Sequence, residues 1–260
     1  MSNSDQADGQ APGIDEVERN RIFVTMSATF KDEPKCRAAM ETIVRDAHAA
    51  YGVTSHFWFR SDDGPSLFVI EQYADRSALS KAVRRFTSAR ISFFRSIKVN
   101  EVSVYGDVSF GLKAAFSPLR PTYMGYHAGF SKTVAALNEP GIKDAERDRV
   151  FVATNAIVRD TAASHRAIDA LVEGAHAAAK TKSHFWTRSR DGKALFAVEQ
   201  YADAKALREH LAADPYSTAA ALPSVDVSDV TVYGAQPDEI KQMLAPLSPT
   251  YMSYYGGYSK

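Results

Sequence analysis

The sequence predicts an α+β protein built from two tandem copies of one small unit, packed sheet against sheet around a shared pocket. The main observation is a repeat: Ser-His-Phe-Trp at 55–58 recurs at 183–186, and Glu-Gln-Tyr-Ala-Asp at 71–75 recurs at 199–203. Both pairs have an offset of 128 residues (58 to 186, 71 to 199). A period this long is typical of a duplicated domain, because the repeats of a solenoid span only about 20–50 residues. The second observation is that both copies predict the same order of strands and helices.

The repeat also predicts the domain boundaries. The copies align without a gap, so we expect domains at 20–132 and 149–260. Residues 133–148 contain an Asn-Glu-Pro-Gly turn signal followed by charged residues, which predicts a linker. Residues 1–19 are rich in Ser, Asp, Gln, Gly and Pro and lack the apolar core of a signal peptide, which predicts a disordered leader.

The first half of each copy predicts a strand, a helix and a hairpin. Residues 22–28 alternate between aliphatic side chains and Phe, Thr or Ser, the pattern of a half-buried strand. Asp32 then precedes a helix with one apolar stripe. Val53–Arg60 and Ser66–Tyr73 flank an Asp-Asp-Gly-Pro turn and predict the hairpin. The apolar stripe consists of Cys36, Met40, Ile43, Val44 and Ala47.

The second half of each copy completes a β-α-β-β-α-β order. Asp75 and its counterpart Asp203 are natural N-caps for a second helix. A last strand, at Val99–Tyr105 in the first copy, precedes a short amphipathic helix and a tyrosine-rich tail, whose tyrosines we expect to pack over the other copy. This ferredoxin-like order covers one sheet face with helices and leaves the other bare. A bare apolar face needs a partner, so we expect an intrachain pseudo-dimer that encloses a cavity.

Composition excludes several classes of function. The chain has 31 Lys and Arg against 31 Asp and Glu, so nothing electrostatic favours nucleic acid or an anionic membrane as a partner. Cys36 is the one cysteine, which excludes an intrachain disulfide and a cysteine-based zinc site. No apolar run is long enough for a membrane span. We therefore expect a soluble, cytoplasmic protein, and leave open whether tandem chains pair further into a homodimer.

The segment from Glu199 to Leu211 resembles the signature of the antibiotic-biosynthesis-monooxygenase family. It reads Glu-Gln-Tyr at the end of a strand and Ala-Leu-Arg-Glu-His on the following helix. The resemblance implies the dimeric α/β-barrel fold, which agrees with the expected pairing of bare faces. The first copy departs from the pattern, because Ala82 stands where the second copy has His210. We therefore expect either one active site or two pockets of different character.

Strand periodicity groups the candidate ligand-binding side chains. In the second copy, alternation places one polar and aromatic set on one face and Phe185, Phe196 and Val198 on the other. We expect the apolar set beneath the helices and the polar set in the barrel interior, a cavity suited to a flat aromatic or quinone-like ligand. The polar set is His184, Trp186, Arg188, Glu199 and Tyr201, with His56, Trp58, Arg60 and Tyr73 in the first copy and Asn155 on the first strand of the second.

The resemblance implies oxygenation of a small aromatic, quinone or polyketide-type ligand, an oxidoreductase activity with no metal, flavin or other cofactor. In such oxygenases the substrate anion supplies electrons to dioxygen, and the protein removes a proton and stabilises the anion. His210 is the expected catalytic base. Trp186, Tyr201 and Asn155 would position the ligand, and Arg188 or His184 would hold an oxyanion.

Structural interpretations of the same residues remain open. Arg188 and Glu199 could form a buried cross-strand ion pair that serves only stability. His56 and His184 occur in both copies, which fits a structural hydrogen bond equally well, and the tryptophans could be core residues.

Two other functions compete with oxygenation. The missing histidine of the first copy fits a non-catalytic binding or carrier module. Heme degradation is disfavoured, because the heme-degrading relatives carry a tryptophan at the position of His210 and their iron-binding histidine ten residues later. This chain has Ala220 and Ser92 at those later positions.

Overall fold

The computed structural model describes residues 20–62, 64–85, 87–131, 148–177, 181–213 and 223–259. The predicted leader and nearly all of the predicted linker lie outside the described residues, so the domain boundaries stay predictions. Within the described part, no helix is long and apolar enough to span a membrane.

Both copies have the predicted order of elements, and the first copy has one helix, α4, that the sequence analysis missed. The first copy consists of β1 (Ile22–Phe30), α2 (Glu33–Ala49), β2 (Val53–Ser61), β3 (Ser66–Tyr73), α3 (Arg76–Arg84), α4 (Ser88–Ser96), β4 (Ile97–Tyr105), α5 (Phe110–Phe116) and β5 (Thr122–Ser131). The second consists of β6 (Val150–Val158), α7 (Thr161–Ala177), β7 (Thr181–Ser189), β8 (Ala194–Tyr201), α8 (Ala204–Ala213), β9 (Val225–Gly234), α9 (Asp238–Leu244) and β10 (Thr250–Ser259).

Aspartate caps begin the main helices of both copies. The predicted caps of the second helices are confirmed: the carboxylate of Asp75 accepts the backbone N–H of Ala78 at 2.8 Å, and that of Asp203 accepts the N–H of Ala206 at 2.7 Å. Asp32 caps α2 in the same way. Each cap satisfies a backbone donor that the first helical turn leaves without a partner, and so sets where the helix begins.

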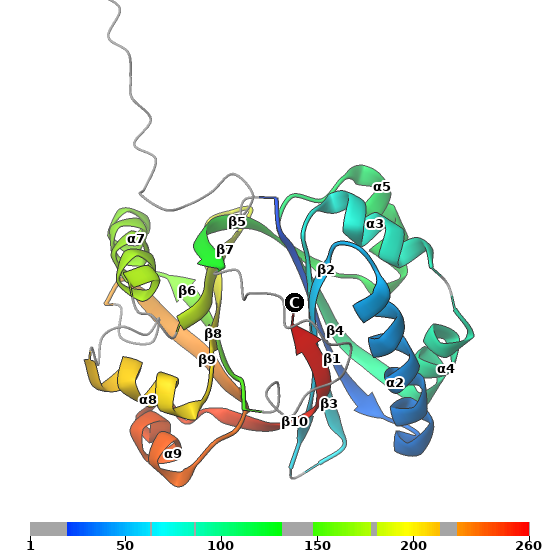
Figure 1. Ribbon diagram of the computed structural model, residues 1–260. Coiled ribbons are helices and arrows are strands. Elements are labelled where there is room, and N and C mark those ends of the chain that lie inside the picture. The colour runs from blue at the N-terminus through cyan, green and yellow to red at the C-terminus, as the bar shows by residue number, and fades with distance from the viewer. Residues whose placement is uncertain are drawn as a thin grey trace, which may run out of the picture.

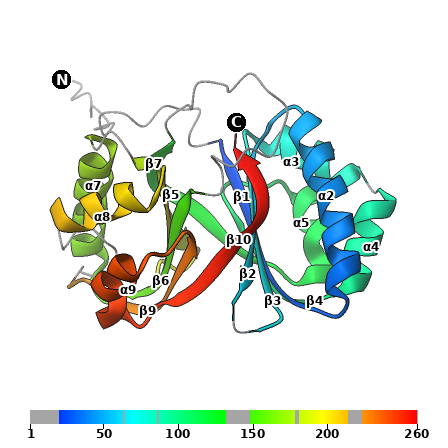
Figure 2. The same cartoon turned by 60° about the horizontal axis from the view of Figure 1, so that its bottom comes forward.

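The ten strands form one closed barrel (Figures 1 and 2). Each copy contributes an antiparallel four-stranded sheet, in the orders β4-β1-β3-β2 and β9-β6-β8-β7. The tails are strands: β5 pairs parallel with β4 of its own copy and antiparallel with β7 of the other, and β10 likewise joins β9 to β2. The helices lie outside, α2 to α5 on one flank and α7 to α9 on the other (Figure 1). Closure leaves no sheet edge unpaired, which is the usual solution to exposed edge strands.

Aromatic rings from both copies fill the barrel. The cluster between the two sheets contains four phenylalanines and tyrosines from each copy, together with methionine and aliphatic side chains. Within the described part of the chain, these packed rings occupy the place of the predicted inter-sheet pocket. Four ring pairs that join the copies have centroids 4.3 to 4.8 Å apart: Phe23–Phe185, Tyr105–Phe196, Phe68–Tyr233 and Phe57–Phe151.

The structure reverses the predicted assignment of the sheet faces. Phe185, Phe196 and Val198, expected beneath the helices, lie inside the barrel. Trp186 packs against the residues of α7, and Tyr201 packs against those of α8. The prediction that one polar set faces the barrel interior is therefore wrong for His184, Trp186, Arg188, Glu199 and Tyr201, and for their counterparts His56, Trp58, Arg60 and Tyr73.

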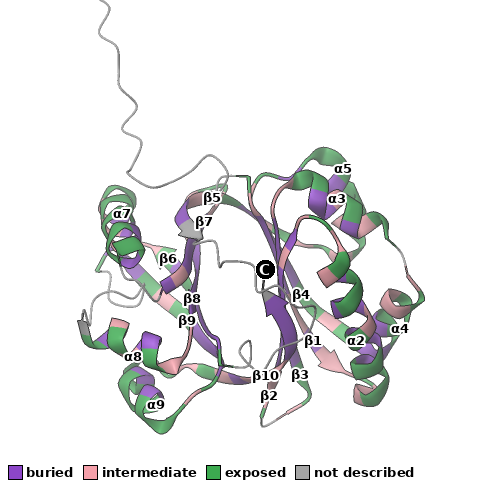
Figure 3. Ribbon diagram, in the orientation of Figure 1, coloured by how far each residue is buried: buried purple, intermediate pink, exposed green. Residues whose placement is uncertain are grey.

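The physical reason is that both faces of each sheet are covered. Alternation with a period of two separates the side chains into two sets, but it does not say which layer each set enters. Most strand residues are buried, and the exposed residues lie mainly on the outer sides of the helices, in the loops and at strand ends (Figure 3). The aromatic set fills the space between the copies, and the polar set lies beneath the helices, where hydrogen bonds join His184, Glu199 and Tyr201.

Closure of the barrel requires glycine in the tail strands. Gly257 of β10 has φ +143, and a Cβ there would lie 2.3 Å from the carbonyl oxygen of His56. Gly129 of β5 has φ +147, and its Cβ would lie 2.2 Å from the carbonyl oxygen of His184. A side chain at either position would push the tail away from the strand with which it pairs.

We predict that Gly257→Ala destabilises the protein, by about 1–3 kcal/mol or more, because alanine is strained at this φ and its methyl group meets backbone. Urea unfolding measures the change. The matched control is Gly174→Ala in the last turn of α7, where a Cβ meets open space. It should stabilise the protein by about 0.5–1 kcal/mol. Equal effects of the two substitutions would contradict the role assigned to the tail glycines.

Candidate functional site

Five of the predicted site residues of the second copy gather between its sheet and its helices. His184 and Trp186 lie on β7, Glu199 and Tyr201 on β8, and His210 on α8. The four strand residues are at most 2% exposed, whereas His210 is half-buried. We call these five residues the β7–β8 site. Among the five residues of this site, His210 is thus the one most exposed to solvent or to a ligand.

A hydrogen-bonded chain joins the buried members of the β7–β8 site. The Trp186 indole donates to Nε2 of His184 at 2.9 Å, and the same Nε2 lies 3.3 Å from Oε1 of Glu199. The Tyr201 hydroxyl donates to Oε2 of Glu199 at 2.5 Å. A protonated Nε2 donates to Glu199, while a deprotonated Nε2 accepts from Trp186. The position of one proton therefore decides which of the two contacts of His184 is made.

Glu199 is the electrostatic centre of the site. Burial acts to raise the pKa of Glu199, but the charge and hydrogen bond of His184, the hydrogen bond of Tyr201 and the charge of His210 together lower it. Burial and the charge of Glu199 raise the pKa of Tyr201 well above its usual value. The site therefore holds an ionised carboxylate beside a neutral phenol and two imidazoles. The His210 ring lies over Tyr201, with centroids 5.3 Å apart.

The first copy repeats the contacts of the carboxylate but lacks both the indole–imidazole hydrogen bond and the histidine on the helix. Nε2 of His56 lies 3.2 Å from Oε1 of Glu71, and the Tyr73 hydroxyl donates to Oε2 of Glu71 at 2.5 Å. Ala82, at the position of His210, is buried. Burial lowers the pKa of His56; Glu71 opposes this and Arg90 adds to it. The first copy therefore has a carboxylate–imidazole pair without a second histidine beside it.

Two residues outside the predicted site set complete the layer in the first copy. Tyr258 belongs to β10 of the second copy, yet it is 2% exposed within the helix-covered core of the first, and its ring lies 4.9 Å from that of His48. This placement confirms that a tail tyrosine packs against the other copy. Arg90 lies on α4, the helix that was not predicted, and its charge acts on His56 and Tyr73. The contact of Tyr258 with the first copy is evident only from the course of β10, which crosses to that copy.

Three predicted site residues lie elsewhere. Asn155 is exposed on β6. Arg188 contacts His165 and Ser164 of α7, so the alternative that it pairs with Glu199 is wrong. Arg60 donates to Glu33 of α2 at 2.8 Å.

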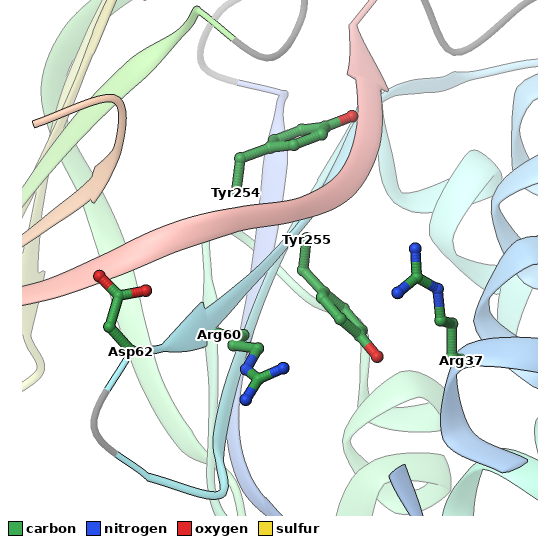
Figure 4. A pocket seen from close by; sticks show the side chains of 5 residues that line it. All are labelled: Arg37, Arg60, Asp62, Tyr254 and Tyr255. Atoms are coloured by element: carbon green, nitrogen blue, oxygen red, sulfur yellow. The ribbon is translucent and has the colours of Figure 1, made fainter. Parts of the chain in front are cut away.

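Arg60 also lines an open hollow of about 570 Å³ at the junction of β2, α2 and β10. Within it the Tyr255 side chain points between Arg60 and Arg37, while Tyr254 lies on the opposite side of β10 (Figure 4). The Tyr255 hydroxyl also donates to Glu33, at 3.3 Å. Among the described residues, no group of three or more His, Cys, Asp and Glu side chains is arranged to hold a metal ion.

Comparison with known proteins shows the fold. No protein-family profile matches the sequence, and no curated protein matches it either. Among solved structures, a "putative monooxygenase" from Lactobacillus acidophilus NCFM is similar, with 15% identity, a TM-score of 0.54, and 80% of this chain and 91% of that chain covered. Another protein of that name, from Fusobacterium nucleatum, has 13% identity and a TM-score of 0.52 over 93% of this chain and 97% of that chain. The chain therefore has the dimeric α/β-barrel fold, with both halves in one polypeptide.

We predict that Glu199→Gln destabilises the protein near neutral pH and does so less in acid. The pKa of Glu199 is lower in the folded state than its ordinary 4.5. Its contribution is therefore complete above about pH 4.5 and is lost as the pH falls through the folded-state pKa. Urea unfolding of both proteins at pH 7 and at lower pH measures this, with an expected loss of about 1.5–3 kcal/mol at pH 7.

The control for this prediction is Glu41→Gln, which changes an exposed carboxylate of α2. Its effect should stay within about 0.5 kcal/mol at every pH. A destabilisation by Glu199→Gln that does not change with pH would show that the carboxylate charge is not what the site stabilises.

Proposed function

We propose that the second copy acts on a small aromatic ligand as a cofactor-independent oxygenase, with His210 as the base that removes a proton from the ligand. The observation that carries this proposal is the difference between the copies. A carboxylate with its imidazole and phenol partners occurs in both, but a half-buried histidine stands beside them only in the second copy. The first copy keeps its core with Ala82 at that position, so the histidine is not needed for folding.

The ligand is expected on the helix side of β7 and β8, next to His210. The barrel interior is excluded for it, because aromatic rings of both copies pack there. Trp186 and Tyr201 are too deeply buried to touch a ligand in this conformation, so we assign them to positioning. Tyr201 and His184 hold Glu199, and the charge of Glu199 favours the imidazolium form of His210.

The fold of the chain is shared with two proteins named as monooxygenases, and the chemistry we propose is of that type. The simplest substrate has an acidic CH₂ group between two aromatic rings. His210 takes one proton, and the delocalised carbanion gives its electron pair to dioxygen as a C–O bond forms. The peroxide takes the proton back from His210. Loss of the second C–H proton then breaks the O–O bond, which leaves a carbonyl and releases one water.

These reaction steps balance in atoms and electrons without a protein-bound cofactor. The ligand's CH₂ group and one dioxygen become a carbonyl group and one water, and the four electrons that reduce dioxygen come from the two C–H bonds. The protein contributes a base, a charge that stabilises its protonated form and a site shielded from bulk water.

We predict that His210→Ala lowers the rate of oxygen consumption with anthrone about 10²-fold or more, the usual contribution of a positioned general base. An oxygen electrode measures uptake with and without protein. The matched control is His176→Ala, an exposed histidine of α7, which should leave the rate unchanged. Circular dichroism of all variants confirms folding.

Two results would contradict the proposal. Full oxygen uptake by His210→Ala would remove the histidine from the chemistry. Tight binding of anthrone without oxygen uptake by the wild-type protein would support the second candidate, a carrier module. That candidate is favoured by the presence of the same carboxylate–imidazole pair in a first copy that lacks the base.

A further inference from the structure

The charged side chains that line the hollow of the first copy neutralise one another. Arg60 donates to Glu33 at 2.8 Å, and the Tyr255 hydroxyl donates to the same oxygen at 3.3 Å. The Arg37 guanidinium lies over the Tyr255 ring, 5.3 Å from its centroid. Asp62 also lines the hollow. Two arginines thus face two carboxylates, and Glu33 is the anion that both Arg60 and Tyr255 bind.

The equivalent place in the second copy has lost both carboxylates. With the offset of 128 residues, Glu33 corresponds to Thr161 and Asp62 to Arg190. The two arginines and one tyrosine of the hollow become one arginine and two histidines. Arg60, Arg37 and Tyr255 correspond to Arg188, His165 and His127. The sequence therefore replaces a neutral set of side chains with a cationic one.

The structure brings these three side chains together from three elements and both copies. Arg188 of β7 contacts Nε2 of His165 on α7 through one terminal nitrogen, and Ser164 Oγ at 3.2 Å through the other. His127 of β5, from the tail of the first copy, has its ring 4.6 Å from that of His165. Burial, and then the charges of Arg188 and His165, lower the pKa of His127 to about 4. The lowered pKa leaves His127 neutral at neutral pH, so the Arg188 guanidinium carries the positive charge of the cluster.

Two carboxylates that flank these elements in the sequence are engaged elsewhere. Asp160 accepts the backbone N–H of Ala163 as the cap of α7. Asp191 accepts the Ser189 hydroxyl and the backbone N–H of Lys193. Arg188 Nε and His127 Nε2 are buried donors or acceptors that no described residue satisfies. A buried polar atom without a partner is costly, and an anion between Arg188 and His127 would satisfy both.

We propose that Arg188, His165 and His127 form a carboxylate-binding site in the second copy, where the carboxylate of a small molecule takes the place that the Glu33 side chain occupies in the first. The ligand class follows from the first copy, in which the same arrangement of strand, helix and tail binds a carboxylate of the chain itself. The planar guanidinium of Arg188 is suited to this group. The site is separate from His210, because Arg188 pairs with Leu195 at the end of β7 opposite to His184 and Glu199.

The test uses sodium benzoate as the probe and the full-length protein, with titration followed by the imidazole signals in NMR. The wild-type chain should bind one benzoate, with saturable shifts of His127 and His165. Arg188→Gln should weaken binding about tenfold or more, because it removes a charge-assisted hydrogen bond. His210→Ala should bind benzoate as the wild type does, which separates this site from the proposed oxygenase chemistry.

The most decisive variants place in one copy the residues that distinguish the other copy. Thr161→Glu places the carboxylate of the first copy at the start of α7, an exposed position where glutamate is favourable, and should abolish benzoate binding. The double change Glu33→Thr with Asp62→Arg should raise the stoichiometry from one to two. Thermal unfolding confirms that both variants fold.

Three outcomes would overturn the proposal. They are the absence of saturable binding to the wild-type chain, benzoate binding unaffected by Thr161→Glu, and tighter binding of inorganic phosphate than of benzoate with the same dependence on Arg188. The last would identify a phosphate site in place of a carboxylate site.

Discussion

The pairing of each tail strand with the other copy is the constraint on which the structure depends. β5 and β10 extend their own sheets and then complete the opposite one, so neither copy closes without the other. Closure requires the sheets to face each other, and the aromatic side chains of both copies fill the space between them. Because that space is packed, polar chemistry is left to the layers between sheet and helices. The same crossing brings Tyr258 and His127 into the layers of the opposite copies.

Duplication then allows the two layers to differ while the core stays the same. Both copies keep the carboxylate, phenol and imidazole that hold β2 to β3 and β7 to β8. The copies differ at the edges of these layers. His210 of the second copy corresponds to Ala82 of the first, and Glu33 of the first copy corresponds to Thr161 of the second. The second copy thus has a histidine base at one end of its layer. At the other end it lacks the carboxylate that Glu33 provides in the first copy. A site of this kind can change without loss of the fold, because its distinguishing residues are at least partly exposed or small.

The sequence predicted the membership of the β7–β8 site better than its location. Periodicity correctly grouped His184, Trp186, Glu199 and Tyr201 on one face, and the family resemblance added His210. The face itself was misassigned, because the two sheet surfaces are both buried and the alternation looks the same for either choice. The predicted ion pair between Arg188 and Glu199 was wrong for a related reason. Strand register places His184 opposite Glu199, while Arg188 reaches α7, and no spacing within the strands distinguishes these partners.

The sequence by itself determined the duplication, the order of strands and helices, the aspartate caps and the inequality of the copies, because these are local or can be read by aligning one half with the other. Only the tertiary structure decided which layer each face of the sheet enters, that the tails are strands, and that the barrel is filled. Those outcomes depend on contacts between residues far apart in the sequence, such as Met124 with Ser189 and Met252 with Ser61. Their free energy comes from shape and burial across the two copies, which local patterns do not contain.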